Sequence, residues 1–498
     1  MKFNLKKGEK RMKFGVNTIK IGTADAVIVP VTYKNFDKAK GFENTVRHLF
    51  DTERFKAEFN EIFTLSCLKD DNYQNLVFIG LGKEKEVTSE KIRVAFSTVI
   101  KKCRKLKVEK VYVNSIYVEG LGFNELVNAM IEGIGFGDYK FNKYKSDKKE
   151  QKDIEICIGN VPSSEKGKEV KEYIAEAATL IETTLFARDL VNEPANIMTP
   201  KALAEAASDA GRKCGFEVEV FDKAQIEELN MKAFLSVTAG SENSPKLIVM
   251  RYFGDKDSKE ILGFVGKGLT YDSGGYSIKT NSGMVTMKSD MGGGAAVIGA
   301  ISAVAKRKLK VNVIAVVAAC ENLISGGAYK PGDIISSMAE KSIEVLSTDA
   351  EGRLTLADAV YYAVSRENVT KIIDIATLTG AALTALGITT TAVVTNDKDF
   401  YNELENASYK SGEKVWMLPA FDEYKELIKS DIADLKNVGG KFAGTITAGL
   451  FIGEFVKKKP WLHLDIAGTA WRDNKEGYFS KGGTGVGVRT LYYLAKNE

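Results

Sequence analysis

The chain has 498 residues, and its composition, 44% hydrophobic and 27% charged, is typical of a globular protein. Because one hydrophobic core stops growing at about 250–300 residues, this length predicts about two domains. The 70 basic and 66 acidic residues leave a formal charge of only +4, which gives no reason to expect a nucleic-acid or membrane partner.

Strand-like and helix-like stretches alternate through the N-terminal third of the chain. The predicted strands are Ala26–Val31, Asn75–Gly82, Lys110–Asn114 and Asp153–Gly159, and the predicted helix is Ser89–Leu106. This alternation predicts a small α/β domain, residues 1–163, which contains no catalytic cluster. An amphipathic pattern from Lys168 to Leu190 predicts a linking helix within residues 164–191.

A larger α/β domain is predicted over residues 192–498. Its strand-like segments are Phe216–Phe221, Lys246–Tyr252, Ile261–Gly266, Val311–Ala319, Ile343–Leu346, Ile372–Ala376, Ala392–Asn396 and Leu462–Ile466. Its helix-like segments are Ala295–Lys308, Arg353–Ser365 and Gly485–Ala495. Near-continuous apolar strands separated by helices predict a mixed or parallel central sheet covered by helices on both faces.

The first residues of the chain lack the continuous apolar core of a secretory signal, and the five cysteines form no CxxC pair. Both observations favour a cytoplasmic protein with reduced thiols. Only two histidines are present, His48 and His463, which argues strongly against a histidine-based zinc site or a Ser-His-Asp triad.

Two clusters of polar residues interrupt the apolar runs of the second domain. The first contains Lys267, Asp272, Lys279 and Asp290, and the second contains Asp349, Glu351 and Arg353. Lys267 follows one predicted strand and Asp349 follows another, and ligands of such sheets bind at the carboxyl ends of strands. Ionised groups beside buried strands are costly unless they neutralise one another or bind something.

The four carboxylates could converge only if a cation offset their mutual repulsion. Oxygen ligands suit Mg²⁺, Mn²⁺ or Ca²⁺, and Zn²⁺ tolerates them. A spacing of two in extended backbone would project Asp349 and Glu351 from the same side. The neighbouring glycines match neither GxxxxGK[ST] nor GxGxxG, so a phosphate-binding loop is not expected. Together the clusters predict a two-metal hydrolytic centre.

The ordered motifs between Glu182 and Arg489 resemble those of the leucyl (cytosol) aminopeptidase family of dinuclear metallopeptidases. They are Gly266–Gly268, Asp272–Gly275, Met287–Gly293 and Thr348–Leu354, supported by Asn192–Asn196, Ala376–Ala381 and His463–Trp471. The N-terminal third matches this family only as a plausible α/β partner domain.

The resemblance implies a role for each matching residue. The implied metal ligands are Lys267, Asp272, Asp290, Asp349 and Glu351. Asp272 and Glu351 would bridge the two ions, Lys267 and Asp290 would belong to the tighter site, and Asp349 to the more exchangeable one. Lys279 and Arg353 occupy the catalytic positions. The implied substrate pocket consists of Met287, Thr377, Leu378 and Gly380.

The chemistry fits these implied roles. A dication can lower the pKa of Lys267 enough for its neutral amine to act as a ligand, and two ions, Mn²⁺ or Zn²⁺, acidify a bridging water. Lys279 as a cation would polarise the scissile carbonyl. The resemblance supplies a bicarbonate, held by Arg353, as general base. It also implies peptide substrates with a free amine, a preference for leucine and other apolar N-terminal residues, and a homohexamer.

Two other functions are compatible with parts of the pattern. A two-metal phosphoesterase would also use a pair of carboxylate-bridged ions. A non-catalytic binding or scaffolding protein could keep the fold, although the retention of all seven polar positions argues against it.

Overall fold

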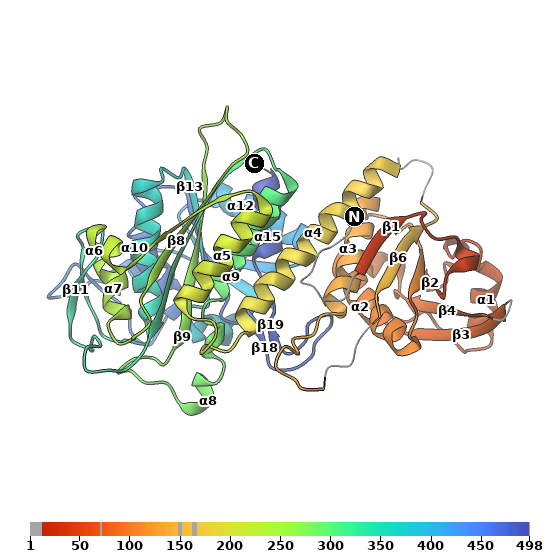
Figure 1. Cartoon of the computed structure of the whole chain (residues 1–498), viewed down its shortest axis with the longest axis horizontal. Helices are drawn as coiled ribbons and strands as arrows, with labels where there is room; N and C mark the ends of the chain where they lie inside the picture. The colour runs from red at the N-terminus through yellow and green to blue at the C-terminus, as the bar shows by residue number, and fades with distance from the viewer. Residues whose placement is uncertain (1–11, 70–71, 148–151, 162–166, 498) are drawn as a thin grey trace. The chain divides into compact units, whose positions relative to one another are not determined.

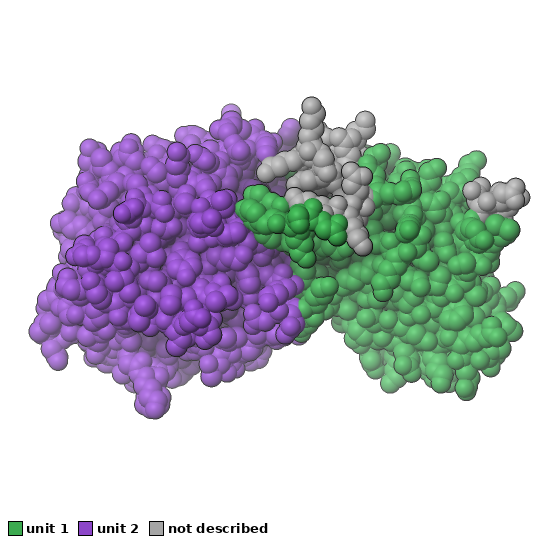
Figure 2. Space-filling view, turned by 60° about the horizontal axis from the view of Figure 1, so that its bottom comes forward, with its two compact units in different colours: residues 1–182, 475–480 green, residues 183–474, 481–498 purple. Residues whose placement is uncertain are grey.

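The computed structural model describes residues 12–69, 72–147, 152–161 and 167–497, and Figure 1 shows their helices and strands. The chain forms two compact units, coloured separately in Figure 2: residues 1–182 with 475–480 make unit 1, and residues 183–474 with 481–498 make unit 2. The predicted domain boundary at residues 163 and 164 lies outside the described residues. Helix α4 (Gly167–Asn192) contributes residues to both units.

Unit 1 contains a six-stranded sheet in the order β1-β6-β5-β2-β4-β3. The strands of this sheet are β1 (Met12–Val16), β2 (Ala26–Val31), β3 (Ile62–Lys69), β4 (Asn72–Gly80), β5 (Lys110–Asn114) and β6 (Ile154–Gly159). The unit also contains helices α1 (Glu43–Asp51), α2 (Ser89–Leu106) and α3 (Phe123–Gly137). Every neighbouring pair is parallel except β3 with β4. The α/β domain predicted for the N-terminal third is therefore confirmed.

Unit 2 contains an eight-stranded mixed sheet in the order β15-β14-β17-β13-β9-β10-β8-β7. Its strands are β7 (Glu217–Phe221), β8 (Lys246–Phe253), β9 (Leu262–Asp272), β10 (Asn312–Asn322), β13 (Lys371–Ala376), β14 (Thr390–Thr395), β15 (Lys414–Met417) and β17 (Trp461–Asp465). The four central strands are mutually parallel, whereas β8 and β14 run antiparallel to their central neighbours β10 and β17. A ligand site is therefore expected where the central strands end.

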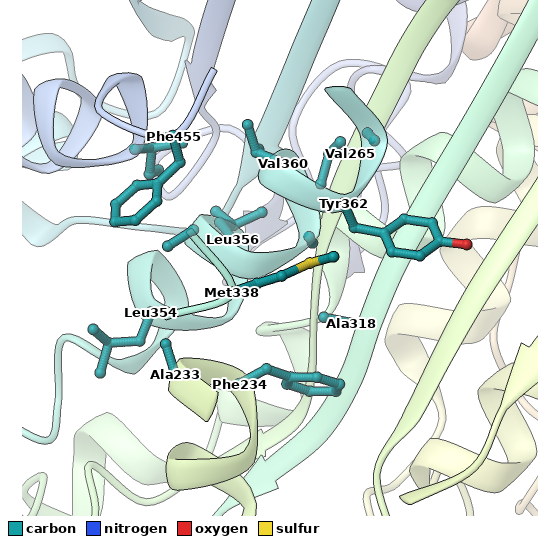
Figure 3. Packing of buried hydrophobic residues seen from close by; sticks show 14 of the residues in the cluster. Ala233, Phe234, Val265, Ala318, Met338, Leu354, Leu356, Val360, Tyr362 and Phe455 are labelled. Atoms are coloured by element: carbon teal, nitrogen blue, oxygen red, sulfur yellow. The ribbon is translucent and has the colours of Figure 1, made fainter. Parts of the chain in front are cut away.

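Helices flank this sheet in two groups. The first group is α5 (Pro200–Cys214), α9 (Gly292–Arg307), α12 (Lys398–Ser411) and α15 (Val488–Asn497); the second is α7 (Lys232–Thr238), α10 (Glu351–Arg366), α13 (Asp422–Glu426) and α14 (Gly444–Gly453). The main core of unit 2 lies under α10. Figure 3 shows Leu354, Leu356 and Val360 of α10 packed with Phe234 of α7 and Val265 of β9. This packing fixes the helix that begins at Glu351.

The remaining elements of unit 2 are short. They are α6 (Lys223–Glu228), α8 (Asn281–Met284), α11 (Gly380–Leu386), β11 (Ile334–Ser336), β12 (Ser342–Glu344), β16 (Leu435–Lys436), β18 (Trp471–Arg472) and β19 (Gly482–Gly483). Strands β11, β12 and β16 form a separate small sheet. Among the described residues, no helix combines the length and the apolar character needed to cross a bilayer.

Two strand predictions near the polar clusters need correction. Strand β9 continues through Asp272, so Lys267 lies inside the strand and does not follow it. Gly266 and Gly268 look like loop residues in the sequence, yet both pair with β10 in the sheet. A side chain at Gly266 would lie 2.6 Å from the carbonyl oxygen of Gly293, so this glycine allows α9 to approach β9. The other predicted strand, Ile343–Leu346, corresponds to β12 of the small sheet, so Asp349 does not follow a strand of the central sheet.

Candidate metal centre

The five residues of the proposed ligand set and Lys279 meet where β9 ends. Strand β9 supplies Lys267 and Asp272, the turn before α9 supplies Asp290, and α10 begins at Glu351. Asp272, Asp290 and Glu351 are all buried, and each offers a carboxylate oxygen such that the three oxygens lie within 4.8 Å of one another. The fold therefore gathers buried carboxylates from three separate segments.

Lys267 lies between two of these carboxylates. Its Nζ is 2.8 Å from Oδ1 of Asp290 and 2.8 Å from Oε1 of Glu351, and it donates a hydrogen bond to the carbonyl of Thr377 at 3.1 Å. Burial alone would lower the pKa of Lys267, but the charges of Asp290, Glu351 and Asp272 outweigh it and raise the pKa above its ordinary value. These neighbouring charges favour the ammonium form of Lys267.

Lys279 pairs with the other side of the cluster. Its Nζ lies 2.7 Å from Oδ2 of Asp272 and also contacts Oδ1 of Asp349. Burial acts to lower the pKa of Lys279, and the charges of Asp272, Glu351 and Asp290 again outweigh it, so the net shift is upward. Lys279 and Asp349 are the more accessible members, with side chains 19% and 39% exposed.

Three carboxyl groups of the cluster have raised pKa values. Burial, followed by the nearby Asp272, raises the pKa of Glu351 to about 8. Burial likewise raises the pKa of Asp290 to about 6, against the opposing charge of Lys267. The pKa of Asp349 is also raised, mainly by burial. Burial is the largest cause of all three shifts, and repulsion from Asp272 adds to each of them.

The donor set fits divalent cations. Among the described residues, Oδ2 of Asp290 and Oε2 of Glu351 have no hydrogen-bond partner although both atoms are buried. Buried polar atoms are normally satisfied, and an ionised carboxylate without a partner is especially costly. When the four carboxylates and two lysines are all ionised, two negative charges remain in excess. Oxygen-rich ligation with such a charge suits hard or borderline dications.

Two glycines allow the cluster to be this compact. A Cβ on Gly352 would lie 2.6 Å from Nζ of Lys267, so a side chain at residue 352 would push the end of this lysine away from its carboxylate partners. Gly274 has φ +86°, and a Cβ there would lie 2.8 Å from Oδ1 of Asp349. The glycine allows the chain to turn immediately after Asp272.

Arg353 is buried near the cluster, and only part of its guanidinium is hydrogen-bonded to the described residues. Its Nη1 donates to the carbonyl of Asn437 at 2.7 Å, while its Nε has no hydrogen-bond partner among the described residues. Burial lowers the pKa of Arg353 to about 10, against the charges of Glu351 and Asp465. It remains a cation at neutral pH. Asp358, in the same helix, accepts hydrogen bonds from the backbone N–H groups of Phe234 and Met338.

Three of the four proposed pocket residues, Thr377, Leu378 and Gly380, follow β13 in the chain. Thr377 follows β13, and its hydroxyl donates to Oδ1 of Asp290 at 2.8 Å, so it touches the cluster directly. Leu378 is half-buried against the core of unit 2, and Gly380 is exposed at the start of α11. Met287 is half-buried in the turn that precedes Asp290.

The prediction of extended backbone between Asp349 and Glu351 was wrong, and some hydrogen bonds around the cluster were not predicted. Glu351 begins a helix, so Asp349 and Glu351 are not paired across extended backbone. The structure adds Asn322, whose amide donates to Oδ1 of Asp272, and Thr348, which accepts from that amide and from the hydroxyl of Tyr329. The only sequence signal for Asn322 was a polar residue a few positions beyond the apolar run Val311–Ala319, and the structure makes it the last residue of β10.

Comparisons with known proteins place this arrangement in a family. The model of the cytosol aminopeptidase family's catalytic domain matches residues 185–492, and that of its N-terminal domain matches residues 31–148. This chain belongs to the cytosol aminopeptidase family. The resemblance noted in the sequence is therefore confirmed.

Individual members of the cytosol aminopeptidase family align over nearly the whole chain. A probable cytosol aminopeptidase of Clostridium perfringens is 58% identical over 488 residues, which cover 97% of this chain and 99% of the relative. One of Alkaliphilus oremlandii is 47% identical, covering 95% and 97% of the two chains. The solved structure of the bottromycin maturation enzyme BotP has a TM-score of 0.84 and 30% identity, and the match covers 95% of this chain and 99% of that enzyme.

Family membership decides between the functions left open by the sequence. Cytosol aminopeptidases are dinuclear metal-dependent hydrolases that remove residues from the N-terminus of peptides. The chain is therefore an enzyme of that class, a metallo-exopeptidase with peptide substrates. The phosphoesterase and the non-catalytic scaffold are set aside.

Binding of a divalent cation should release protons, because the cation replaces protons held by the cluster. Glu351, with a pKa of about 8, is mostly protonated at pH 7, and its proton must leave before both oxygens can bind a cation. We expect release of about one proton or more per chain at pH 7, and weaker Mn²⁺ affinity as the pH falls from 8 to 6. Calorimetric titrations in two buffers of different ionisation enthalpy measure this release. Equal apparent enthalpies in the two buffers would contradict the expectation.

Proposed function

We propose that the enzyme releases leucine and other apolar residues from peptide N-termini, with two divalent ions held by Lys267, Asp272, Asp290, Asp349 and Glu351. The observation that carries this proposal is the buried excess of carboxylates, with unpartnered oxygens on Asp290 and Glu351. Ions at this position would acidify a water molecule and polarise the scissile carbonyl.

The proposed ligands differ in burial, which supports two unequal ion sites. The Asp290 and Lys267 side chains are 5% and 3% exposed, whereas that of Asp349 is 39% exposed. A cation beside Lys267 and Asp290 would be shielded from water, and one beside Asp349 would exchange more readily. Asp272 and Glu351, between these two ends, would bridge the ions. Mn²⁺ is one candidate for both positions, since the BotP structure includes a complex with Mn; Zn²⁺ is the other.

Lys279 is proposed to stabilise the developing oxyanion. It is the accessible cation of the cluster, beside Asp272 and Asp349, so a substrate carbonyl can reach it without entering the core. A fixed cation aimed at the carbonyl oxygen is worth more in the transition state, where negative charge develops on that oxygen. Lys267 cannot take this role, because its Nζ is enclosed by Asp290, Glu351 and Thr377.

Arg353 is proposed to hold a bicarbonate that acts as general base. Neither histidine belongs to the cluster: His463 is fully buried and its Nδ1 pairs with Asp374 at 2.5 Å. The proton acceptor must therefore be another group, and the unpartnered Nε of Arg353 offers a buried donor to a planar anion. The substrate side chain would lie against Met287, Thr377, Leu378 and Gly380, of which Thr377 touches Asp290.

Location and assembly belong to the same proposal. A cytoplasmic location is supported by the names of the relatives, which are cytosol aminopeptidases. The homohexamer is proposed from the family resemblance. Contact between subunits would cover large apolar side chains of unit 2 such as Trp416, Phe421, Ile432 and Phe442, which are each more than 60% exposed in the single chain.

Cleavage should require both the ions and a free substrate amine. We expect Mn²⁺-loaded enzyme to hydrolyse leucine p-nitroanilide, a chelator to abolish the rate, and N-acetyl-leucine p-nitroanilide to remain intact, because an acetylated amine can no longer coordinate a metal. Release of p-nitroaniline measures all three. A panel of N-terminal residues then tests the side-chain preference. Equal rates on the acetylated substrate would remove the amine from the mechanism.

Arg353→Ala should lower kcat by about 10²-fold or more, the usual contribution of a general base, and added bicarbonate should no longer stimulate the enzyme. Arg366→Ala is a matched control, since Arg366 is exposed at the far end of the same helix. Steady-state rates at increasing bicarbonate compare the two variants with the wild type. An Arg353→Ala enzyme as fast as wild type would exclude this role.

A further inference from the structure

Strands β9 and β10 end side by side with an irregular register. Cys320 pairs with Leu269, but Glu321 pairs with Tyr271 and Asn322 with Asp272, so β9 carries one extra residue at this point. Without this shift Asn322 would pair with Tyr271. Because paired residues of parallel strands project to the same face, the bulge places the Asn322 side chain beside that of Asp272.

The Asn322 amide joins the two halves of the metal centre. It is fully buried, and its Nδ2 donates to Oδ1 of Asp272 at 2.8 Å and to the carbonyl of Thr348 at 2.9 Å. Thr348 directly precedes Asp349. Both neighbours are acceptors, so the NH₂ group must face them, and the amide orientation is set by chemistry. One side chain therefore restrains a proposed ligand and the backbone next to another.

The two carboxylate oxygens of Asp272 have different partners. Oδ1 accepts from Asn322 and from the backbone N–H of Gly274 at 2.8 Å. Oδ2 faces Lys279 instead. A carboxylate held by two donors on one oxygen cannot rotate freely, and its other oxygen keeps a fixed direction.

We propose that Asn322 is a positioning residue that holds Asp272 by Oδ1 and so reserves Oδ2 for the metal ions. This inference rests on the proposed ligand role of Asp272. An amide suits the task because an aspartate at position 322 would repel Asp272, and an apolar residue would leave Oδ1 with a single donor. Asn322 does not touch the substrate and acts only through Asp272 and Thr348.

Asn322→Leu and Asn322→Ala should weaken Mn²⁺ binding about 10- to 100-fold, as removal of a hydrogen-bonding partner of a metal ligand commonly does. The Mn²⁺ concentration that gives half-maximal activity should rise in parallel, with part of the rate restored at high Mn²⁺. Calorimetric titration measures the affinity. Wild-type affinity in the variants would overturn the proposal, whatever happens to their activity.

Asn312→Leu is the matched control. Asn312 is a buried asparagine at the other end of β10, and its amide bonds the backbone of Ser258, Glu260 and Asp255. It should lower the midpoint of urea unfolding without changing Mn²⁺ affinity, which separates loss of stability from loss of positioning. Unfolding of unit 2 can be followed by tryptophan fluorescence, because Trp416, Trp461 and Trp471 all lie in it.

A second measurement does not depend on whether the variants fold. In a crystal structure of the Mn²⁺-loaded wild type, Asp272 should bind metal through Oδ2 while Oδ1 stays on Asn322. Metal on Oδ1, or a broken contact with Asn322, would overturn the inference. Failure of the wild type to bind Mn²⁺ at all would instead overturn the proposed function.

Discussion

The metal centre of unit 2 depends on one constraint: carboxylates of like charge are buried next to one another. Asp272, Asp290 and Glu351 lie within a few ångströms of one another, compensated only in part by Lys267 and Lys279. Burial, together with repulsion from Asp272, raises the pKa of Glu351 and of Asp290. The cluster is stable only if the surrounding fold holds the carboxylates together and a bound cation offsets their charge. In the proposed function, two dications offset this charge.

The fold enforces the cluster through close backbone approach. A side chain on Gly293 would lie 1.9 Å from the carbonyl of Ile375, so the first turn of α9 rests directly on β13. Gly352 similarly brings α10 onto Lys267. Leu354 and Val360 on the apolar face of α10 pack into the core (Figure 3). This packing fixes the position of Glu351 at the start of the helix. Glycines and core packing thus hold the ligands in place before any ion arrives, which is how rigid metal sites are generally built.

Much of this could be predicted from local sequence, and the reasons for the failures are physical. β2, β5 and α2 have the predicted limits because the two strands are short runs of mostly apolar residues and the helix has an amphipathic pattern. Lys267 was placed after its strand because the glycines beside it resemble loop residues, whereas both pair with β10 and Gly266 allows α9 to pack against the strand. Asn322 could not be identified, since its role depends on a register shift between β9 and β10 that no local pattern records. The charged residues themselves were recognisable because ionised groups rarely interrupt buried strands.

The most direct test of the account is the number of Mn²⁺ ions bound per chain at saturation, measured by equilibrium dialysis against an excess of Mn²⁺. Elemental analysis should find two ions per wild-type chain. In Glu351→Gln, which removes the proposed bridging carboxylate, both ions should be lost or strongly weakened. A wild-type chain that binds no metal, or a variant that binds both ions, would contradict the claim that this buried cluster is a two-metal site.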